Sequence, residues 1–488
     1  MIQSALYLII FFLAALSFKN EINFFYFDGI YSMQTIFFKK IKKNCNWKNK
    51  NINNHIYFIY TKTMGLCSIS LLHAFVICLG SMLMGHVGAY TSPTGQKIRE
   101  EHHLSDQDFK WSFYCSISFL AAAFGPFVSK FLLNIFKGKR KNTMFVIGAI
   151  SVVAWLLNCL TKINIYAGWM ARALLGITVG SFSSVTAMFL VEIAPKGLSG
   201  FYGSLNTIAV FFAQSIISFL GPFVDYIEYN YLSAAVSAAL CISIWFIPES
   251  PLVASSPINE APKKVPICRK RHSKGLFIGI TIMFLQQFSG INGILANLTD
   301  IFREAGLDLN PNYQSGISLI ILLFGNILGS FMIDKIGQRN QWFITTSLSF
   351  IGCFMMALND KFKWSNILPL ICIFTYNFGF GLGLGSIPWF LVFDLFDEQV
   401  REIGNTICVV SNWSFAFIIV MLFPSMKESL GMFGVMMLFA AVCFIAIIFG
   451  IFFVHNAIKN EGEEVENLDS AESSYADFSL NNEDKPNQ

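Results

Sequence analysis

The sequence predicts an all-α membrane protein with twelve transmembrane helices arranged as two six-helix repeats. Of its 488 residues, 54% are hydrophobic and 13% are charged, whereas soluble domains carry about 25% charged residues. The mean hydropathy is +0.56. Many apolar runs reach roughly 20 residues, the length that crosses a bilayer core. Lys and Arg are concentrated in alternate loops between these runs.

The first 63 residues differ from the rest of the chain. Residues 5–16 are apolar but too short for a span, and residues 1–4 lack the positive charge of a signal peptide. Residues 39–50 are basic and rich in Asn. Because a good span follows Met64 directly, we expect Met64 to be the true start and residues 1–63 to be an extension from the gene model. A basic cytoplasmic extension is the alternative.

After Met64 the apolar runs divide into two sets of six. We expect residues 64–251 and 275–455 to form the two halves, residues 252–274 a cytoplasmic linker, and residues 456–488 a disordered acidic tail. The predicted spans lie near residues 66–89, 111–133, 143–161, 166–190, 203–223, 231–247, 275–297, 315–333, 341–358, 367–393, 404–424 and 431–454.

Basic residues mark one face of the membrane. They cluster in the loop after the second span and in the loop after the sixth, while loops on the other face are poorer in Lys and Arg. The basic residues are Lys137, Lys139, Arg140 and Lys141 in the first loop, and Lys263, Lys264, Arg269, Lys270, Arg271 and Lys274 in the second. The positive-inside rule therefore predicts that both termini are cytoplasmic.

The two halves resemble each other in sequence. Glu192 is followed seven residues later by Ser199, and Asp394 is followed seven residues later by Arg401. Residues 138–140, after the second span, correspond to Gly337-Gln-Arg339, after the eighth, with an offset of about 200 residues. Such offsets are typical of transporters built from two parallel six-helix repeats.

One apolar run, residues 275–295, carries amide side chains at membrane depth. Amides there are costly unless they face a bundle interior or a wet cavity. Gly290 and Gly293 weaken the helix at this point, and broken helices lining a cavity are where transporters bind their solutes. Amides donate and accept hydrogen bonds, which suits an uncharged solute with several hydroxyls. The alternative is that the amides hold helices together. The polar residues are Gln286, Gln287, Ser289 and Asn292.

Over about residues 64–457 the chain resembles the sugar porter family of the major facilitator superfamily, and within it the facilitative hexose transporters. The matching motifs are Gln286 to Asn292 in the seventh span, Pro248-Glu249-Ser250-Pro251, Asp334 to Arg339, Ile387 to Phe390 with Asp394 and Arg401, Ser411-Asn412-Trp413, Arg172 to Gly176, and Glu192 to Pro195. Residues 89–93 also resemble trehalose and related transporters of insects.

The resemblance implies the fold of that superfamily, passive transport of a hexose such as glucose by alternating access in the plasma membrane, and no enzymatic activity, cofactor or nucleic-acid partner. It also implies the residues that bind the sugar. Amides of the seventh and eleventh spans form hydrogen bonds with the sugar, and two tryptophans pack their aromatic faces against it. Further residues of the seventh and fifth spans also contact the sugar. These residues are Gln286, Gln287, Asn292, Asn297, Trp389, Asn412, Trp413, Asn206 and Thr207.

A set of charged residues is expected to pair at the cytoplasmic ends of the helices and to hold an inner gate shut. The alternative is that these charges only anchor helices at the headgroup level. The set is Arg172, Glu192, Glu249, Asp334, Arg339, Asp394 and Arg401. Two arginines of the family motifs are replaced, by Leu252 and by Ser199, so the gate is less charged than usual.

Two other functions remain open. A proton-coupled sugar or polyol symporter needs a titratable group in the path, and related symporters have an aspartate where this chain has His86. His86 is the possible proton site, and its alternative role is helix packing. A sugar sensor that does not transport is the rival of another class, and the short tail after His455 argues against it.

The sequence contains no pattern typical of an enzyme or of a metal site. No nucleophile–base pair stands out, and the eleven cysteines are scattered without a CxxC pair or a Cys/His cluster. A phosphate-binding lysine loop is missing, so the sequence does not indicate that a bound nucleotide drives transport.

Overall fold

A computed structural model describes residues 50–195, 198–251, 253, 270–396 and 398–454, and these residues are helical nearly throughout, with no strand among them. The predictions for residues 1–49, for most of the 252–274 linker and for the 456–488 tail lie outside the described residues. Within this described part of the chain, eleven apolar helical segments are long enough to cross a membrane. One of them, Ile403–Phe453, has 51 residues and covers the last two predicted spans, so the twelve-helix fold predicted from the sequence is confirmed.

The N-terminal half contains the first six spans and one helix that the sequence did not predict. That helix is α5, Thr91–Glu101, which follows the first span. The first span lies in α4, which begins at Lys50, earlier than the predicted start of the span. The remaining elements are α6 Phe109–Ala122, α7 Gly125–Ile135, α8 Arg140–Asn158, η1 Cys159–Lys162, α9 Ile165–Glu192, α10 Ser199–Leu220, α11 Tyr226–Ser243 and η2 Ile244–Phe246.

The C-terminal half contains the other six spans, several of them bent or broken. Two long helices, α16 Pro311–Phe362 and α19 Glu398–Phe453, change direction at Gly337 and Gly431, whose φ values are 79° and 67°. Glycine adopts this left-handed backbone without strain. The other elements are α13 Lys270–Phe288, α14 Ile291–Ala296, α15 Leu298–Ala305, α17 Leu368–Gly379, the π-helix η3 Phe380–Leu384 and α18 Ile387–Asp394.

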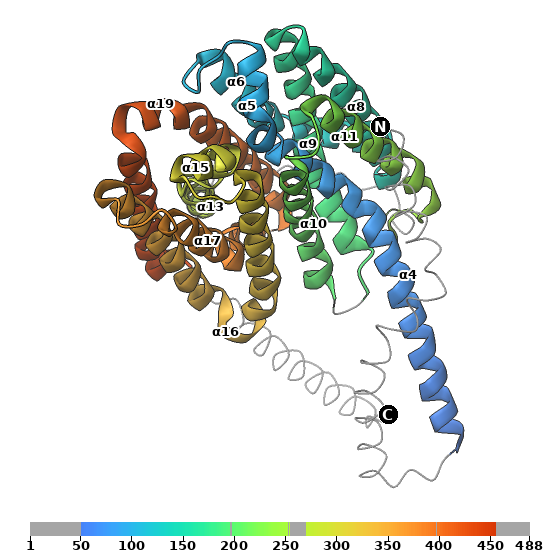
Figure 1. The fold of residues 1–488 in the computed structure, drawn as a ribbon. Coiled ribbons are helices and arrows are strands. Elements are labelled where there is room, and N and C mark those ends of the chain that lie inside the picture. The colour runs from blue at the N-terminus through green and yellow to red at the C-terminus, as the bar shows by residue number, and fades with distance from the viewer. Residues whose placement is uncertain (1–49, 196–197, 252, 254–269, 397, 455–488) are drawn as a thin grey trace, which may run out of the picture.

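The two halves lie side by side, with helices α4–α11 in one and α13–α19 in the other (Figure 1). They meet where α6 packs on α19 and α10 packs on α16. Each half has its own apolar core, and a further apolar cluster joins Ile98 and Tyr90 of the first half to Ala296, Ala416 and Val420 of the second. This shared cluster closes the bundle at the end that carries α5 and α15, which we call the α5–α15 end.

Glycines allow close backbone contact within both halves. Gly176 and Gly180 lie one turn apart on α9, and a Cβ on either would collide with a backbone carbonyl of α6. Gly325 and Gly329 on α16 have the same spacing and face backbone carbonyls of α17 and η3. Small residues at this spacing are typical of tightly packed membrane helices. Both halves therefore use glycines for close packing, although the glycines lie on the fourth span in one half and on the eighth span in the other.

Candidate functional site

Four amide side chains form a continuous chain of hydrogen bonds in the C-terminal half. Asn292 donates to Gln287 Oε1 at 2.6 Å, and Gln287 donates to Asn412 Oδ1 at 3.0 Å. Asn412 in turn donates to Gln286 Oε1 at 2.7 Å, and Gln286 donates to the Leu384 carbonyl at 2.9 Å. Three of the four amides are at most 4% exposed. The structure thus brings together the amides that the sequence assigned to the seventh and eleventh spans.

A break between α13 and α14 makes this arrangement possible. Gly290 has φ 101°, so the helix stops after Phe288 and restarts at Ile291. On an unbroken helix, residues five apart do not face each other. Across the break, Gln287 and Asn292 are directly bonded. The weak point predicted at Gly290 is therefore confirmed, and it positions the site.

The π-helix η3 supplies the backbone end of the amide chain. Gln286 Nε2 lies 2.9 Å from the Leu384 oxygen and 3.2 Å from the Gly385 oxygen. The Leu384 N–H donates to Thr345 Oγ1 at 2.9 Å. A π-helical turn displaces backbone groups from their regular partners, and such turns occur frequently at functional sites. Here the side-chain amide of Gln286 donates hydrogen bonds to the displaced carbonyls of Leu384 and Gly385.

The two predicted tryptophans lie in different surroundings. Trp413 packs on Phe119 of α6 across the interface between the halves, with ring centroids 6.2 Å apart. Its Nε1–H is buried and has no hydrogen-bond partner among the described residues. Trp389 is half-buried beside an apolar cluster that includes Met283 and Cys408. Met283 also contacts the site, because its sulfur lies 3.2 Å from Asn412 Nδ2.

The remaining predicted sugar ligands are not joined to the amide chain by hydrogen bonds. Asn297 donates to the Gly293 carbonyl of its own helix at 2.9 Å. In the N-terminal half, Asn206 accepts from Ser81 Oγ at 2.6 Å. Thr207 Oγ1 lies 3.2 Å from Asn326 Oδ1 on α16, so it connects the two halves.

Several buried amides were missed by the sequence analysis, and Asn326 and Gln214 are two of them. Asn326 is 1% exposed and its Nδ2 has no partner among the described residues. Gln214 on α10 is 7% exposed and its Oε1 likewise has none. The signal that identified Gln286, an amide inside an apolar span, was also present at these two positions.

Arg172 does not belong with the charges at the helix ends, and grouping it there was wrong. It is the eighth residue of α9, about 30 Å along the helix from Glu192, the last one. Its guanidinium is 1% exposed and donates to the Val87 carbonyl at 3.1 Å and to Ser118 Oγ at 3.1 Å. It therefore holds α4, α6 and α9 together within the N-terminal half.

Glu192 and Glu249 meet at the end opposite to α5 and α15, where both bind Arg140. Arg140 Nη2 lies 2.8 Å from Glu192 Oε1, and the Arg140 N–H donates to Glu249 Oε1 at 2.9 Å. All three belong to the N-terminal half. The sequence analysis used Arg140 only as a basic loop residue.

In the C-terminal half, the described members of the predicted gate contact backbone carbonyls. Arg339 Nη2 donates to the Ile451 carbonyl at 3.3 Å, and Arg401 Nε donates to the Phe396 carbonyl at 3.3 Å. The predictions for the side chains of Asp334 and Asp394 lie outside the described part.

His86 lies inside the N-terminal half. Its ring is 4% exposed, and Nδ1 lies 2.9 Å from Ser233 Oγ on α11. Among the described residues that are buried as a whole none is an aspartate or glutamate, although the side chain of Glu192, paired with Arg140, is only 8% exposed. The same part of the chain holds no group of three His, Cys, Asp or Glu that suits a metal ion.

Comparison with known proteins identifies the family. The family described as "Sugar (and other) transporter" matches residues 25–265 and 258–468, which is most of the chain. The chain belongs to this sugar transporter family. The family consists of transporters and not of enzymes, so transport of a sugar across a membrane is the context in which the amide chain is to be understood.

Relatives agree with this assignment, and a solved structure shares the fold. The facilitated trehalose transporter Tret1 of Culex quinquefasciatus is 25% identical over 452 residues, which cover 83% of this chain and 86% of the relative. The sugar transporter ERD6-like 6 of Arabidopsis thaliana is 25% identical over 448 residues, 82% of this chain and 91% of the relative. The inward open xylose transporter XylE from E. coli superposes with TM-score 0.68 at 20% identity, over 83% of this chain and 99% of that one.

In a sugar transporter, a chain of amides has a clear chemical use. Each amide offers two N–H donors and one carbonyl acceptor, and a sugar hydroxyl can both donate and accept. A hydroxyl can therefore enter between two bonded amides and satisfy both of them. Breaking one amide–amide bond leaves no buried polar group unpaired, provided that the sugar replaces it.

Proposed function

We propose that this protein is a facilitative transporter that moves a hexose down its concentration gradient by alternating access. The observation that carries the proposal is the chain of four amides, Asn292, Gln287, Asn412 and Gln286, at the broken seventh span. It recognises hydroxyls and carries no charge. A neutral solute can exchange hydrogen bonds with it without transfer of a proton.

Alternating access is supported by where the halves meet. At the α5–α15 end the two halves share an apolar cluster and direct polar contacts, including Ser92 Oγ to Thr299 Oγ1 at 2.9 Å. At the other end, the ion pair of Arg140 with Glu192 stays inside one half. Rocking of one half against the other would open the first end without breaking that pair.

We further propose that the α5–α15 end faces the outside of the cell and that both termini are cytoplasmic. The basic residues Lys137 to Lys141 lie at the opposite end, which the positive-inside rule assigns to the cytoplasm. On this proposal the protein acts in the plasma membrane.

Coupling to protons is the second candidate, since a solved structure similar in fold is titled D-xylose-proton symporter. His86 is the residue on which such coupling would depend. Its ring is enclosed and bonded to Ser233, an arrangement that favours a role in packing α4 on α11. The relatives' names mention trehalose and xylose, so the substrate has to be tested against a disaccharide and a pentose as well as a hexose.

The test is counterflow in liposomes that contain the purified protein. Liposomes loaded with unlabelled glucose should take up labelled glucose transiently, and excess glucose should compete with it. Trehalose, xylose and a polyol, each tested as the loaded solute and as the competitor, establish the preference. Binding of sugar without counterflow of any of these solutes would overturn transport and favour a sensor. Counterflow of trehalose or xylose alone would overturn the hexose assignment.

A further inference from the structure

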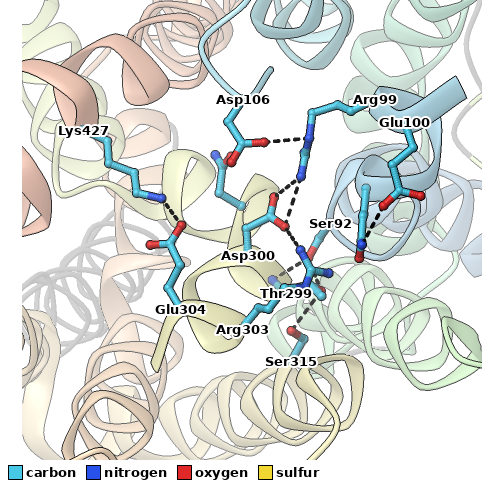
Figure 2. Close-up of polar contacts among 12 residues, drawn as sticks. Ser92, Arg99, Glu100, Asp106, Thr299, Asp300, Arg303, Glu304, Ser315 and Lys427 are labelled. Atoms are coloured by element: carbon cyan, nitrogen blue, oxygen red, sulfur yellow. Dashed lines mark hydrogen bonds and ion pairs between the residues drawn. The ribbon is translucent and has the colours of Figure 1, made fainter. Parts of the chain in front are cut away.

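A charged contact joins the two halves at the α5–α15 end (Figure 2). Arg99 on α5 lies between two carboxylates: its Nε is 2.7 Å from Asp106 Oδ1, and its Nη2 is 3.2 Å from Asp300 Oδ2 on α15. Asp300 is also paired with Arg303, one turn further along α15. The Arg99 side chain is 8% exposed and that of Asp300 14%, so the pair between the halves is largely enclosed.

Helix α5 is firmly attached to the N-terminal half. Lys97 lies 2.8 Å from Asp225 Oδ1, and this hydrogen bond raises the pKa of the Lys97 ammonium. Directly after the C-terminus of α5, the ring of His102 contacts the Thr161 carbonyl at 2.6 Å. When the N-terminal half moves, α5 and Arg99 therefore move with it.

Helix α15 is attached in the same way to the C-terminal half. Glu304 is paired with Lys427 of α19, and Thr299 Oγ1 lies 3.2 Å from Ser315 Oγ of α16 (Figure 2). Asp300 lies between Thr299 and Glu304 on this helix, so it moves with the C-terminal half. Separation of the halves at this end must break the contact between Arg99 and Asp300.

We propose that Arg99 and Asp300 form a latch that stabilises the state closed at the α5–α15 end. We further infer that Asp106 and Arg303, which already pair with these residues in the closed state, keep the two charges paired when the latch opens. The inference rests on the proposed alternating access and adds the residues that set the balance between its two states.

The partners that each charge has within its own half determine how much free energy is needed to open the latch. A charge that loses its only partner on opening would be left unpaired in a partly enclosed site, which is unfavourable. Arg99 keeps Asp106, and Asp300 keeps Arg303, because each pair lies within one half. On opening, each charge loses one of its two partners and keeps the other, so neither is left unpaired. Consequently the two carboxylates on Arg99 have opposite effects: Asp300 favours the closed state, and Asp106 favours the open one.

The test measures how often the α5–α15 end opens. The probe is the substitution Ala296→Cys in a variant without other reactive cysteines. Ala296 lies in the shared apolar cluster and is 5% exposed when this end is closed. Its rate of reaction with a membrane-impermeant maleimide, added from the α5–α15 side, reports opening. Arg99→Gln and Asp300→Asn should each raise this rate roughly three- to tenfold, and Asp106→Asn should lower it.

A matched control is available at the same end. Glu304→Gln removes the ion pair with Lys427, but both partners belong to the C-terminal half, so the labelling rate should stay unchanged. The double variant Arg99→Gln/Asp300→Asn should raise the rate no further than the stronger single variant, because the two residues act through one contact.

Several outcomes overturn the latch. They are an unchanged rate in Asp300→Asn, a rate that rises in Asp106→Asn, or an equal rise in Glu304→Gln. Asp300→Asn keeps the size of the side chain, so it carries the test if Arg99→Gln does not fold. Labelling needs no sugar, and the two proposals can therefore fail separately. If the variants change the labelling rate as expected but the protein transports no sugar, only the proposed function is overturned. If the protein transports sugar normally but the variants leave the labelling rate unchanged, only the latch is overturned.

Discussion

In the N-terminal half, the buried charge of Arg172 is surrounded by fixed neutral partners, whereas in the C-terminal half four amides are bonded mainly to one another. Arg172 lies 5.6 Å from the rings of both Tyr90 and Tyr114 and donates to the Val87 carbonyl near the C-terminus of α4. Helix C-termini favour cations. Each of the three guanidinium nitrogens has a protein partner without a ligand, and the residue holds three helices together.

The amide chain of the C-terminal half is satisfied in a different way. Asn412 accepts from Gln287 and donates to Gln286, and each of these partners is a flexible side chain. A hydroxyl can replace either bond at little cost. On the proposed function, the first half supplies a rigid wall, and the second half supplies the groups that exchange partners with a sugar.

Close packing is the property that both halves share, and breaking it should have the largest effect. A Cβ in Gly180→Ala would collide with the Ala122 carbonyl, and one in Gly329→Ala would collide with the Leu382 carbonyl. We expect each change to cost about 3 kcal/mol of stability or more, because backbone cannot move aside as a side chain can. The measurement is the monodisperse fraction after detergent extraction, together with thermal unfolding.

Gly203→Ala is the control for these glycine changes. The nearest atom to its added Cβ is Val191 Cγ2 at 3.5 Å, an ordinary contact. It should extract and unfold like the original protein. If Gly180→Ala and Gly329→Ala differed strongly from each other, the shared packing of the two halves would be disproved.

Removal of the buried charge should have the second largest effect, and it should be confined to stability. Arg172→Met leaves the Val87 carbonyl and Ser118 Oγ without their donor. Each such loss costs about 1–3 kcal/mol, so we expect a clear fall in the midpoint of thermal unfolding. Arg172→Lys should not restore it, because an ammonium cannot reproduce the planar fork. The half-saturation concentration for sugar in the folded fraction should not change.

The sequence was sufficient to predict the twelve spans and the break at Gly290, because the length of an apolar run and the effect of a glycine on a helix depend only on nearby residues. It was not sufficient for Arg172. This residue was grouped with the helix-end charges by its type, although its position early in the span already placed it near the other end. Helix α5 was missed because its segment is polar, and its helix is stabilised by contacts with α11 and α15 that are distant in sequence.

The sequence predicted which amides belong to the candidate site, but not which hydrogen bonds join them. Gln286 and Asn412 are 126 residues apart, and only the fold brings them to 2.7 Å. The π-helix that accepts from Gln286 lies in a glycine-rich stretch, whose sequence indicates flexibility but not which carbonyls turn inward. Asn326 and Gln214 were missed although they carry the same local signal, since the resemblance drew attention to the motif positions.

Removal of corresponding amides from the two halves should separate their roles. Asn412→Ala breaks two links of the chain, so we expect the half-saturation concentration to rise by roughly five- to a hundredfold. Asn206→Ala loses one bond to Ser81, and we expect a rise of about tenfold at most. Concentration-dependent initial uptake, at matched protein levels, measures both. A larger effect at Asn206 would contradict the assignment of the exchanging groups to the C-terminal half.

Gln287 is the other inner member of the amide chain, but its partner Asn292 is only half-buried, so its loss should matter less than that of Asn412. Gln287→Ala removes the amide between Asn292 and Asn412, and a lost hydrogen bond to a neutral hydroxyl is worth about 0.5–1.5 kcal/mol. The half-saturation concentration should rise by up to about tenfold, with normal expression. An unchanged value would mean that Gln287 only joins helices and does not contact the sugar.

The smallest effect is expected at His86, in the half that we regard as a rigid wall. Its ring is enclosed and bonded to Ser233, and the described side chains of the amide chain do not exchange protons near neutral pH. Uptake of a non-metabolised hexose should therefore reach the external concentration and not exceed it, with or without an uncoupler. His86→Gln should behave in the same way, because an amide can keep a hydrogen bond to Ser233.

Accumulation above the external level that an uncoupler abolishes would disprove the passive mechanism. If His86→Gln also lost that accumulation while exchange of sugar across the membrane continued, His86 would be the proton site. The N-terminal half would then take part in coupling and could no longer be regarded as a passive wall.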